Sequence, residues 1–144
     1  MYDLSGGEAQ KVGEYRDGIA RLTAAEKLPD TLSAFRARLQ TMLPQAGLYC
    51  GSPWLAQAET RETDKLRLFE LHPADYRHLQ NNMETAGLKR RGIIRQEDGF
   101  QGLIALLPPP TRRAVVLIDP PYEQKQDYAR VVHTLKEARK RFEQ

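Results

Sequence analysis

An apolar run that stops at an acid, two prolines and an aromatic residue places the strongest limit on how this chain folds. The run covers residues 114–118, AVVLI, and Asp119-Pro120-Pro121-Tyr122 follows it directly. Because the run shows no alternation of polar and apolar side chains, it is typical of a strand that is buried on both faces of a parallel sheet. Proline fixes the backbone φ angle and lacks an N–H donor, so the turn is stiff and its carbonyl groups have no local partners. The sequence therefore predicts a rigid polar turn at the end of a buried strand.

Helical and strand patterns alternate along the rest of the chain. Residues 1–12 contain Ser-Gly-Gly and are expected to form a loop. Ser52 is expected to cap a helix whose first helical residue is Pro53. Strands are predicted over 66–73, 91–96 and 114–119, and further helices over 13–24, 31–43, 74–87, 99–110 and 126–142. Such alternation with short connections predicts a parallel α/β sheet, since parallel strands need crossover connections.

Composition excludes several classes of protein. The chain has 144 residues, of which 40% are hydrophobic and 28% charged, as in a soluble globular domain. No segment approaches the roughly 20 apolar residues that span a bilayer, and the N-terminus has no export signal, so a cytoplasmic protein without a membrane partner is expected. The single cysteine, Cys50, fits a reducing compartment. The net charge of +3 permits a polyanionic partner. The basic residues near the C-terminus form either a solvated helix face, which we favour, or a nucleic-acid patch.

Each predicted strand is followed by, or ends in, an acidic residue at the same edge of the sheet. Ligands of open parallel sheets bind beyond the carboxyl ends of the strands. Glu70 ends the first strand and suits the two hydroxyls of a ribose, although a surface acid or ion pair is the alternative. Asp98-Gly99 follows the second strand and offers a carboxylate for an amine beside backbone that a flat ring can approach. An ordinary turn is the alternative for this pair.

The turn after the third strand gives the sharpest indication of function. The carboxylate of Asp119 and the carbonyl of Pro120 can both accept from one amino group. Tyr122 can stack on a planar base. A tight turn with a packed tyrosine is the alternative reading. We favour a site that holds a flat ring bearing an amine.

These residues resemble a known family. DPPY after an apolar strand resembles the signature of methyltransferases that act on N6 of adenine or N4 of cytosine. The segments GEYRDGIARL, YCGSPWLAQ, LFELHPADY, EDGFQGLIALLPP and RRAVVLIDPPYE are similar to the bacterial 23S rRNA adenine-N6 methyltransferases. The likeness covers nearly the whole chain.

The resemblance implies a Rossmann-like fold with S-adenosylmethionine as cofactor and 23S rRNA as partner. Residues 1–46 would be a small helical insertion subdomain, and residues 47–144 a core with a partial sheet. Asp119 would be the catalytic acceptor and would also border the cofactor. The other implied residues are Pro120 and Tyr122 in the base pocket, and Ser52, Glu70, Asp98 and Gly99 at the cofactor.

The chain also departs from the family. The segment that carries the family's first strand and glycine-rich cofactor turn is lacking, and the strands beyond the last helix are lacking too. We therefore expect a central fragment with apolar sheet edges, which is poorly stable alone or associates with another chain. A non-catalytic nucleic-acid-binding remnant and a DNA amino-methyltransferase are the alternative functions. The three histidines show no metal-ligand spacing with one another or with Cys50, so no metal site is predicted.

Overall fold

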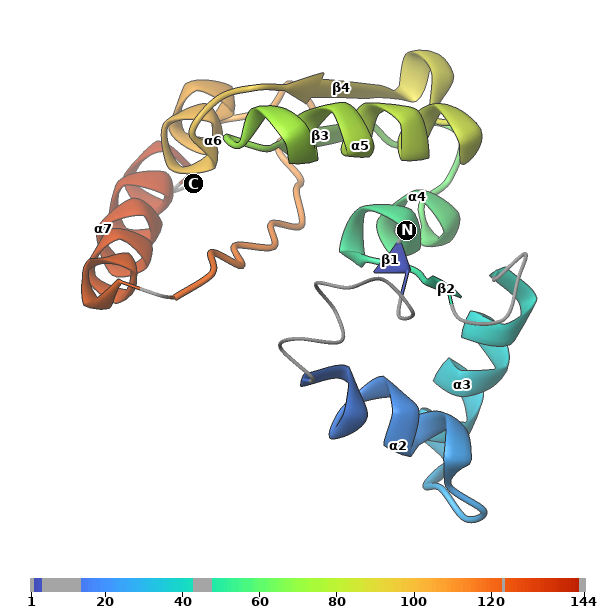
Figure 1. The fold of residues 1–144 in the computed structure, drawn as a ribbon. Coiled ribbons are helices and arrows are strands. Elements are labelled where there is room, and N and C mark those ends of the chain that lie inside the picture. The colour runs from blue at the N-terminus through green and yellow to red at the C-terminus, as the bar shows by residue number, and fades with distance from the viewer. Residues whose placement is uncertain (1, 4–13, 43–47, 123, 143–144) are drawn as a thin grey trace. The chain divides into compact units, whose positions relative to one another are not determined.

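The computed structural model describes residues 2–3, 14–42, 48–122 and 124–142 and divides the chain into two compact units (Figure 1). The first unit comprises Met1–Asp64 and Asn82–Lys89, and the second comprises Lys65–Asn81 and Arg90–Gln144. No helix among these described ranges is both long and apolar enough to cross a membrane.

The first unit contains a short antiparallel strand pair. Strand β1, Tyr2–Asp3, pairs with β2, Leu48–Tyr49. The loop predicted for residues 1–12 is therefore wrong at residues 2–3, because tertiary pairing supplies a partner that local sequence does not reveal. The remainder of that predicted loop lies outside the described residues.

Helices make up most of the first unit. A 3₁₀ turn, η1, covers Glu14–Arg16, and helices α2, α3 and α4 cover Ile19–Ala24, Asp30–Met42 and Ser52–Glu59. The helix predicted over 13–24 is thus interrupted before Ile19, where Gly18 disfavours helical backbone. The helix predicted over 31–43 is confirmed, and Arg36 Nη1 ties it to the carbonyl of Ala25 at 2.5 Å. Among the described residues of this unit, the buried apolar ones are Leu39, Cys50, Met83 and Leu88.

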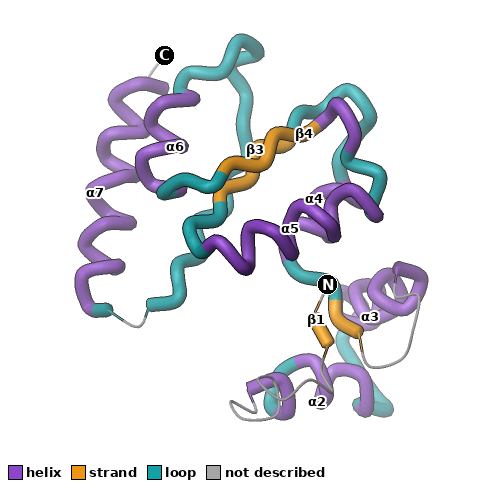
Figure 2. Tube along the Cα trace, turned by 45° about the horizontal axis from the view of Figure 1, so that its top comes forward, coloured by secondary structure: helices purple, strands orange, loops and turns teal. Residues whose placement is uncertain are grey.

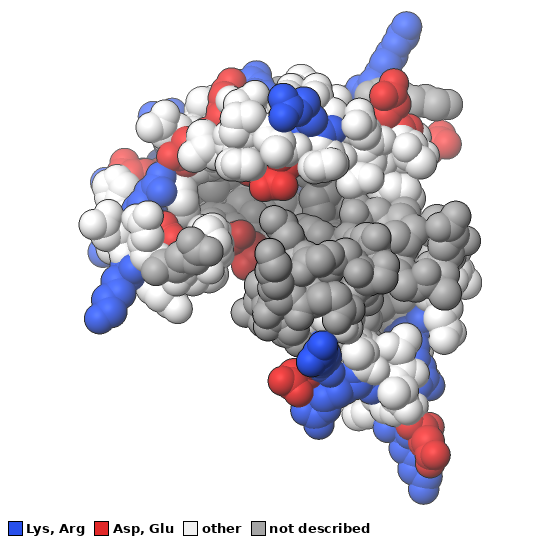
Figure 3. All heavy atoms as spheres, viewed as in Figure 1, with Lys and Arg blue, Asp and Glu red and all other residues white. Residues whose placement is uncertain are grey.

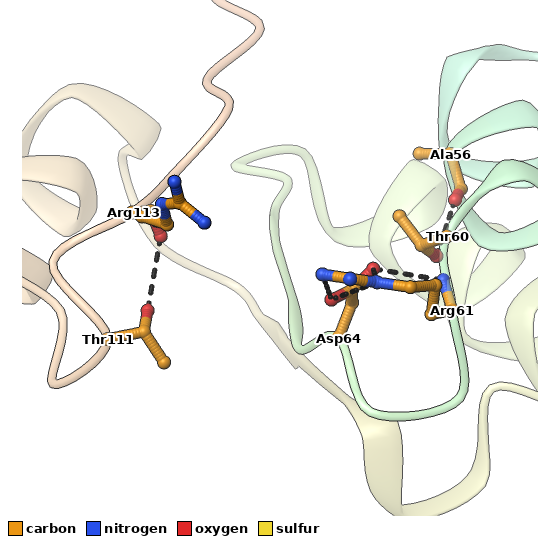
Figure 4. Close-up of polar contacts among 6 residues, drawn as sticks. All are labelled: Ala56, Thr60, Arg61, Asp64, Thr111 and Arg113. Atoms are coloured by element: carbon orange, nitrogen blue, oxygen red, sulfur yellow. Dashed lines mark hydrogen bonds and ion pairs between the residues drawn. The ribbon is translucent and has the colours of Figure 1, made fainter.

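Side-chain bonds fix the turn that follows α4 (Figure 4). Thr60 Oγ1 donates to the carbonyl of Ala56 at 2.7 Å, at the C-terminal end of the helix. The guanidinium and backbone N–H of Arg61 both donate to the carboxylate of Asp64, with N–O distances from 2.9 to 3.3 Å. These bonds reverse the chain just before the next strand.

The second unit holds a two-stranded parallel sheet. Strand β3, Leu66–Phe69, pairs with β4, Gly92–Arg95, so that Leu66 lies opposite Gly92 and Phe69 opposite Arg95. The first two predicted strands are confirmed in type and in parallel orientation, although both are shorter than predicted. Strand β3 ends early because the chain turns at Glu70 into helix α5, Pro73–Thr85.

Helix α5 ends as predicted. Gly87 has φ +76°, a left-handed conformation that glycine adopts without the cost of a Cβ. The N–H of Gly87 donates to the carbonyl of Glu84 at 3.0 Å, and the N–H of Leu88 to that of Met83 at 2.9 Å. A second 3₁₀ turn, η2, Lys89–Arg91, then leads into β4.

Two helices complete the second unit. Helix α6, Gly99–Leu106, and helix α7, Lys125–Phe142, contact each other side by side (Figures 1 and 2). Arg141 Nη1 donates to the carbonyl of Ile104 across this contact at 3.2 Å. Helix α6 also packs on the sheet, and a Cβ added at Gly102 would lie 2.2 Å from a ring carbon of Phe69. The absence of a side chain at Gly102 is therefore a packing requirement.

The third predicted strand is wrong. Residues 114–119 have no strand partner among the described residues and are drawn as loop in Figure 2. Val115 and Leu117 are 102% and 71% exposed, so the expected burial on both faces is also wrong. The physical reason is that a strand exists only as a paired element, whose backbone N–H and C=O groups need a neighbour. The turn just before this segment has a side-chain hydrogen bond, in which Thr111 Oγ1 donates to the carbonyl of Arg113 at 3.2 Å (Figure 4).

Candidate functional site

The carboxyl ends of β3 and β4 bring two of the predicted acids to one edge of the sheet. Glu70 follows β3, and its N–H donates to the carbonyl of Arg95 at 3.1 Å, which extends the ladder by one bond. Its Oε1 accepts from the N–H of His72 at 2.9 Å. Its Oε2 has no partner within the described part of the chain. The carboxylate is thus oriented by its own turn and keeps one oxygen for a ligand.

Asp98 follows β4 and is engaged on both oxygens. Oδ1 accepts from the N–H of Phe100 at 2.9 Å, so that Asp98 is the N-cap of α6. Oδ2 accepts from Arg130 Nη2 of α7 at 2.5 Å. The guanidinium of Arg130 also lies over the ring of Phe100, 4.3 Å from its centroid. Asp98 therefore joins α6 to α7, and a ligand amine would have to share or take the oxygen that Arg130 occupies.

Sequence reasoning missed this capping role, although the signal was present. Asp followed by Gly just before an apolar helical run is a helix start signal. Gly99 is also constrained by packing, because a Cβ there would lie 3.3 Å from the Cβ of Phe69.

Ser52 does not cap its helix. The N-cap of α4 is Gly51, at φ −71° and ψ 169°, and no side chain accepts a cap hydrogen bond. Ser52 is the first helical residue and Pro53 follows it, one position later than predicted. The helix begins earlier because Gly51 provides the extended backbone that an N-cap needs. Ser52 belongs to the first unit, whereas the acids after β3 and β4 belong to the second.

The Asp119–Tyr122 turn is exposed. The Asp119 side chain faces solvent, and no described hydrogen bond joins it to Glu70 or Asp98. Tyr122 has φ +55°, a left-handed conformation that is uncommon for a residue with a side chain. Such backbone strain clusters at ligand-binding and catalytic turns, where the surroundings hold it in place. The structure thus leaves the motif accessible while fixing an unusual backbone at its aromatic residue.

A second tyrosine meets this turn and was missed by sequence reasoning. Tyr128, in the first turns of α7, has its ring centroid 4.8 Å from that of Tyr122, with the ring planes 35° apart. The N–H of Asp127 donates to the carbonyl of Gln124 at 2.9 Å, and the helix starts at Lys125, three residues after Tyr122. The two tyrosines are six residues apart, one in a turn and the other in a helix. Neither the strand period of two residues nor the helix period of 3.6 residues therefore predicts this contact.

Metal chemistry finds no support in the arrangement of possible ligands. Within the described ranges, no three His, Cys, Asp or Glu residues lie together as a metal site. Cys50 is fully buried, and burial raises the pKa of its thiol. A neutral buried thiol packs as a small apolar group rather than acting as a ligand or nucleophile.

Comparison with known proteins decides the family. Residues 1–144 match the model of a family described as "Ribosomal RNA large subunit methyltransferase D, RlmJ". The chain belongs to this family. The sequence resemblance, which includes the DPPY and LFELHP motifs, predicted a family of bacterial ribosomal RNA methyltransferases, and that expectation is confirmed.

Two curated relatives show the extent of the likeness. The chain is 42% identical over 143 residues to the ribosomal RNA large subunit methyltransferase J of Escherichia coli (strain K12), covering 98% of this chain and 50% of the relative. It is 40% identical over 144 residues to the protein of the same name from Haemophilus influenzae, with 98% and 50% covered. The chain therefore spans about half the length of the curated relatives it matches.

A solved structure has the same arrangement. A crystal structure of a protein from Legionella pneumophila str. Philadelphia 1 matches with a TM-score of 0.82 at 32% identity, covering 98% of this chain and 51% of that one. The mixed α/β fold of this chain therefore resembles about half of that solved chain.

Proposed function

We propose that this chain carries the base-binding turn and part of the cofactor site of a cytoplasmic enzyme that methylates N6 of an adenine in 23S rRNA. The observation that carries the proposal is the intact Asp119–Tyr122 turn in a chain that matches the RlmJ family from end to end. DPPY alone is shared with DNA amino-methyltransferases. Ribosomal RNA is favoured over DNA because the curated relatives are named for the ribosomal RNA of the large subunit.

The proposed fold of the complete catalytic unit is Rossmann-like. Its support is the order β3, α5, β4, α6, in which helices alternate with parallel strands. Residues 1–46 would be the helical insertion.

S-adenosylmethionine is the proposed cofactor. When bound, it supplies an electrophilic methyl group on a positively charged sulfur. Glu70 fits a ribose, because its Oε2 is available and its Oε1 is already oriented by His72. Asp98 and Gly99 fit the adenine, provided that Arg130 shares or releases Oδ2. Ser52 is proposed as a further cofactor-binding residue only because the family resemblance implies it.

The proposed chemistry depends on position and charge. The Asp119 carboxylate and the Pro120 carbonyl accept hydrogen bonds from the target amine, which frees the nitrogen lone pair for in-line attack. Tyr122 stacks on the adenine and fixes its plane. Asp119 need not remove a proton beforehand, since the amine becomes strongly acidic once it has been methylated. The gain comes mainly from orientation and electrostatic stabilisation.

Replacing Asp119 tests the proposal. Asp119→Ala is expected to lower methylation of 23S rRNA by about 100-fold or more, since an electrostatic acceptor at the reacting group is lost. Affinity for S-adenosylhomocysteine should remain nearly unchanged. Methylation is measured as N6-methyladenosine by mass spectrometry of digested rRNA, and retained activity would contradict the assignment.

A non-catalytic remnant is the second candidate function. It is favoured by one observation, the exposed Asp119 side chain, which no described hydrogen bond joins to Glu70 or Asp98. A remnant would bind RNA but not S-adenosylhomocysteine, so cofactor titration separates the two functions.

A further inference from the structure

Tyr122 needs support that its own turn does not provide. Pro120 and Pro121 stiffen the backbone that leads to it, and φ +55° sets the direction in which its side chain leaves the chain. Yet Tyr122 is 37% exposed, so part of its surface is not held by packing against the protein. A ring that stacks on a base must be held against rotation, or part of the stacking energy is lost to ordering it.

Tyr128 is placed to provide that support. Its ring centroid lies 4.8 Å from that of Tyr122, with a tilt of 35°, which is within the range of favourable aromatic pairs. Tyr128 is 62% exposed, so its ring does not serve as a core residue of the second unit. The backbone bond from Asp127 to Gln124 anchors the start of α7 and hence the base of the Tyr128 side chain.

We propose that Tyr128 is a positioning residue that holds the Tyr122 ring in the orientation in which it stacks on the target base. This inference rests on the proposed function, because it requires Tyr122 to stack on a base. Tyr128 acts through its ring rather than its hydroxyl. Its substitution therefore weakens base stacking without touching the Asp119 acceptor.

Fluorescence of a base analogue tests the inference. The probe is a short single-stranded RNA that carries one 2-aminopurine, whose emission is quenched when it stacks on an aromatic ring. The 144-residue chain is expected to quench it. Tyr128→Ala should weaken binding by about two- to tenfold, the fold-change that corresponds to one aromatic pair. The extent of quenching when all of the RNA is bound should also fall in this variant. A variant that only weakened the packing of α7 would not lower the quenching at saturation.

Three further variants make the result specific. Tyr128→Phe should restore both affinity and quenching, because it keeps the ring. Tyr128→Leu retains an apolar side chain without a ring and should behave like Tyr128→Ala, and circular dichroism shows whether the fold of each variant is kept. Val132→Ala is the matched control, since Val132 is a 52% exposed apolar residue one turn further along the same helix. It should leave quenching unchanged.

The outcomes separate the inference from the proposed function. If the unaltered chain does not quench the probe, or if Tyr122→Ala quenches it equally well, no base stacks on Tyr122. The proposed base stacking and the inference about Tyr128 would then both be wrong. If Tyr122→Ala abolishes quenching but Tyr128→Ala matches Val132→Ala, the inference alone is overturned. Loss of quenching in Tyr128→Phe would likewise overturn it, because the hydroxyl would then be the active group.

Discussion

Asp98 shows how one carboxylate can serve both the fold and a ligand. It caps α6 through Phe100 and pairs with Arg130 of α7, while its position after β4 suits a nucleotide amine. The two uses compete only for Oδ2. The cap on Oδ1 can persist when a ligand approaches.

Substitution of Asp98 separates these two bonds. Asp98→Asn can still accept from the N–H of Phe100 but loses the charge that holds Arg130, so it should cost at most about 1 kcal/mol of unfolding free energy. Asp98→Ala loses the cap as well and should cost about 1–2 kcal/mol more than Asn. Urea unfolding measures both values. Equal losses would contradict a separate capping role.

Gly102 provides a second test at the level of single residues. Gly102→Ala would bring a Cβ to 2.2 Å from the Phe69 ring, so the helix or the ring must move, at a cost of about 1–3 kcal/mol. Gly99→Ala is the matched control, because its Cβ would meet Phe69 at the milder distance of 3.3 Å. The thermal midpoint of Gly102→Ala should fall below that of Gly99→Ala, and the reverse order would refute the packing of α6 on β3.

At the scale of elements, the sequence predicted local patterns better than long-range pairing. Helices α3, α5 and α7 and strands β3 and β4 were predicted from local patterns, such as the apolar stripe of α3 and the helix end at Gly87. The segment at 114–118 has the pattern of a buried strand, but a local sequence pattern does not show whether a neighbouring strand is present to pair with it. The contact of Tyr122 with Tyr128 escaped prediction for a related reason, since it depends on how a turn enters a helix.

The unpaired segment at 114–118 has a measurable consequence. Its exposed Val115 and Leu117 and free backbone groups favour pairing with another chain. We therefore expect self-association that rises with protein concentration, measured by size-exclusion chromatography with light scattering. A Val115→Lys, Leu117→Lys double variant should shift the protein toward monomer. A monomeric unaltered chain at all concentrations would contradict this expectation.

Charge gives little guidance at the scale of the whole molecule. The described surface over α7 carries Lys and Arg side chains beside Asp and Glu (Figure 3), and Lys140 pairs with Glu137 at 2.6 Å. A net charge of +3 then supports long-range attraction to RNA only weakly. We therefore assign the proposed recognition of an adenine to the Asp119–Tyr122 turn rather than to a basic surface.

The sequence predicted the types of residue in the candidate site but only part of their arrangement in space. The acids at the ends of β3 and β4 lie where the parallel sheet places them. Asp119 remains a proposal, because residues 114–119 form no strand in the described structure and therefore do not carry it to the same edge. A motif specifies its own turn, whereas its place in a sheet depends on strands from elsewhere.

Titration of the folded 144-residue chain with S-adenosylhomocysteine, followed by calorimetry, tests the central claim most directly. The account predicts saturable binding with one ligand per chain, weakened in Glu70→Ala and nearly unchanged in Asp119→Ala. Absence of binding by a chain that circular dichroism shows to be folded would contradict the claim that it carries a working part of the cofactor site.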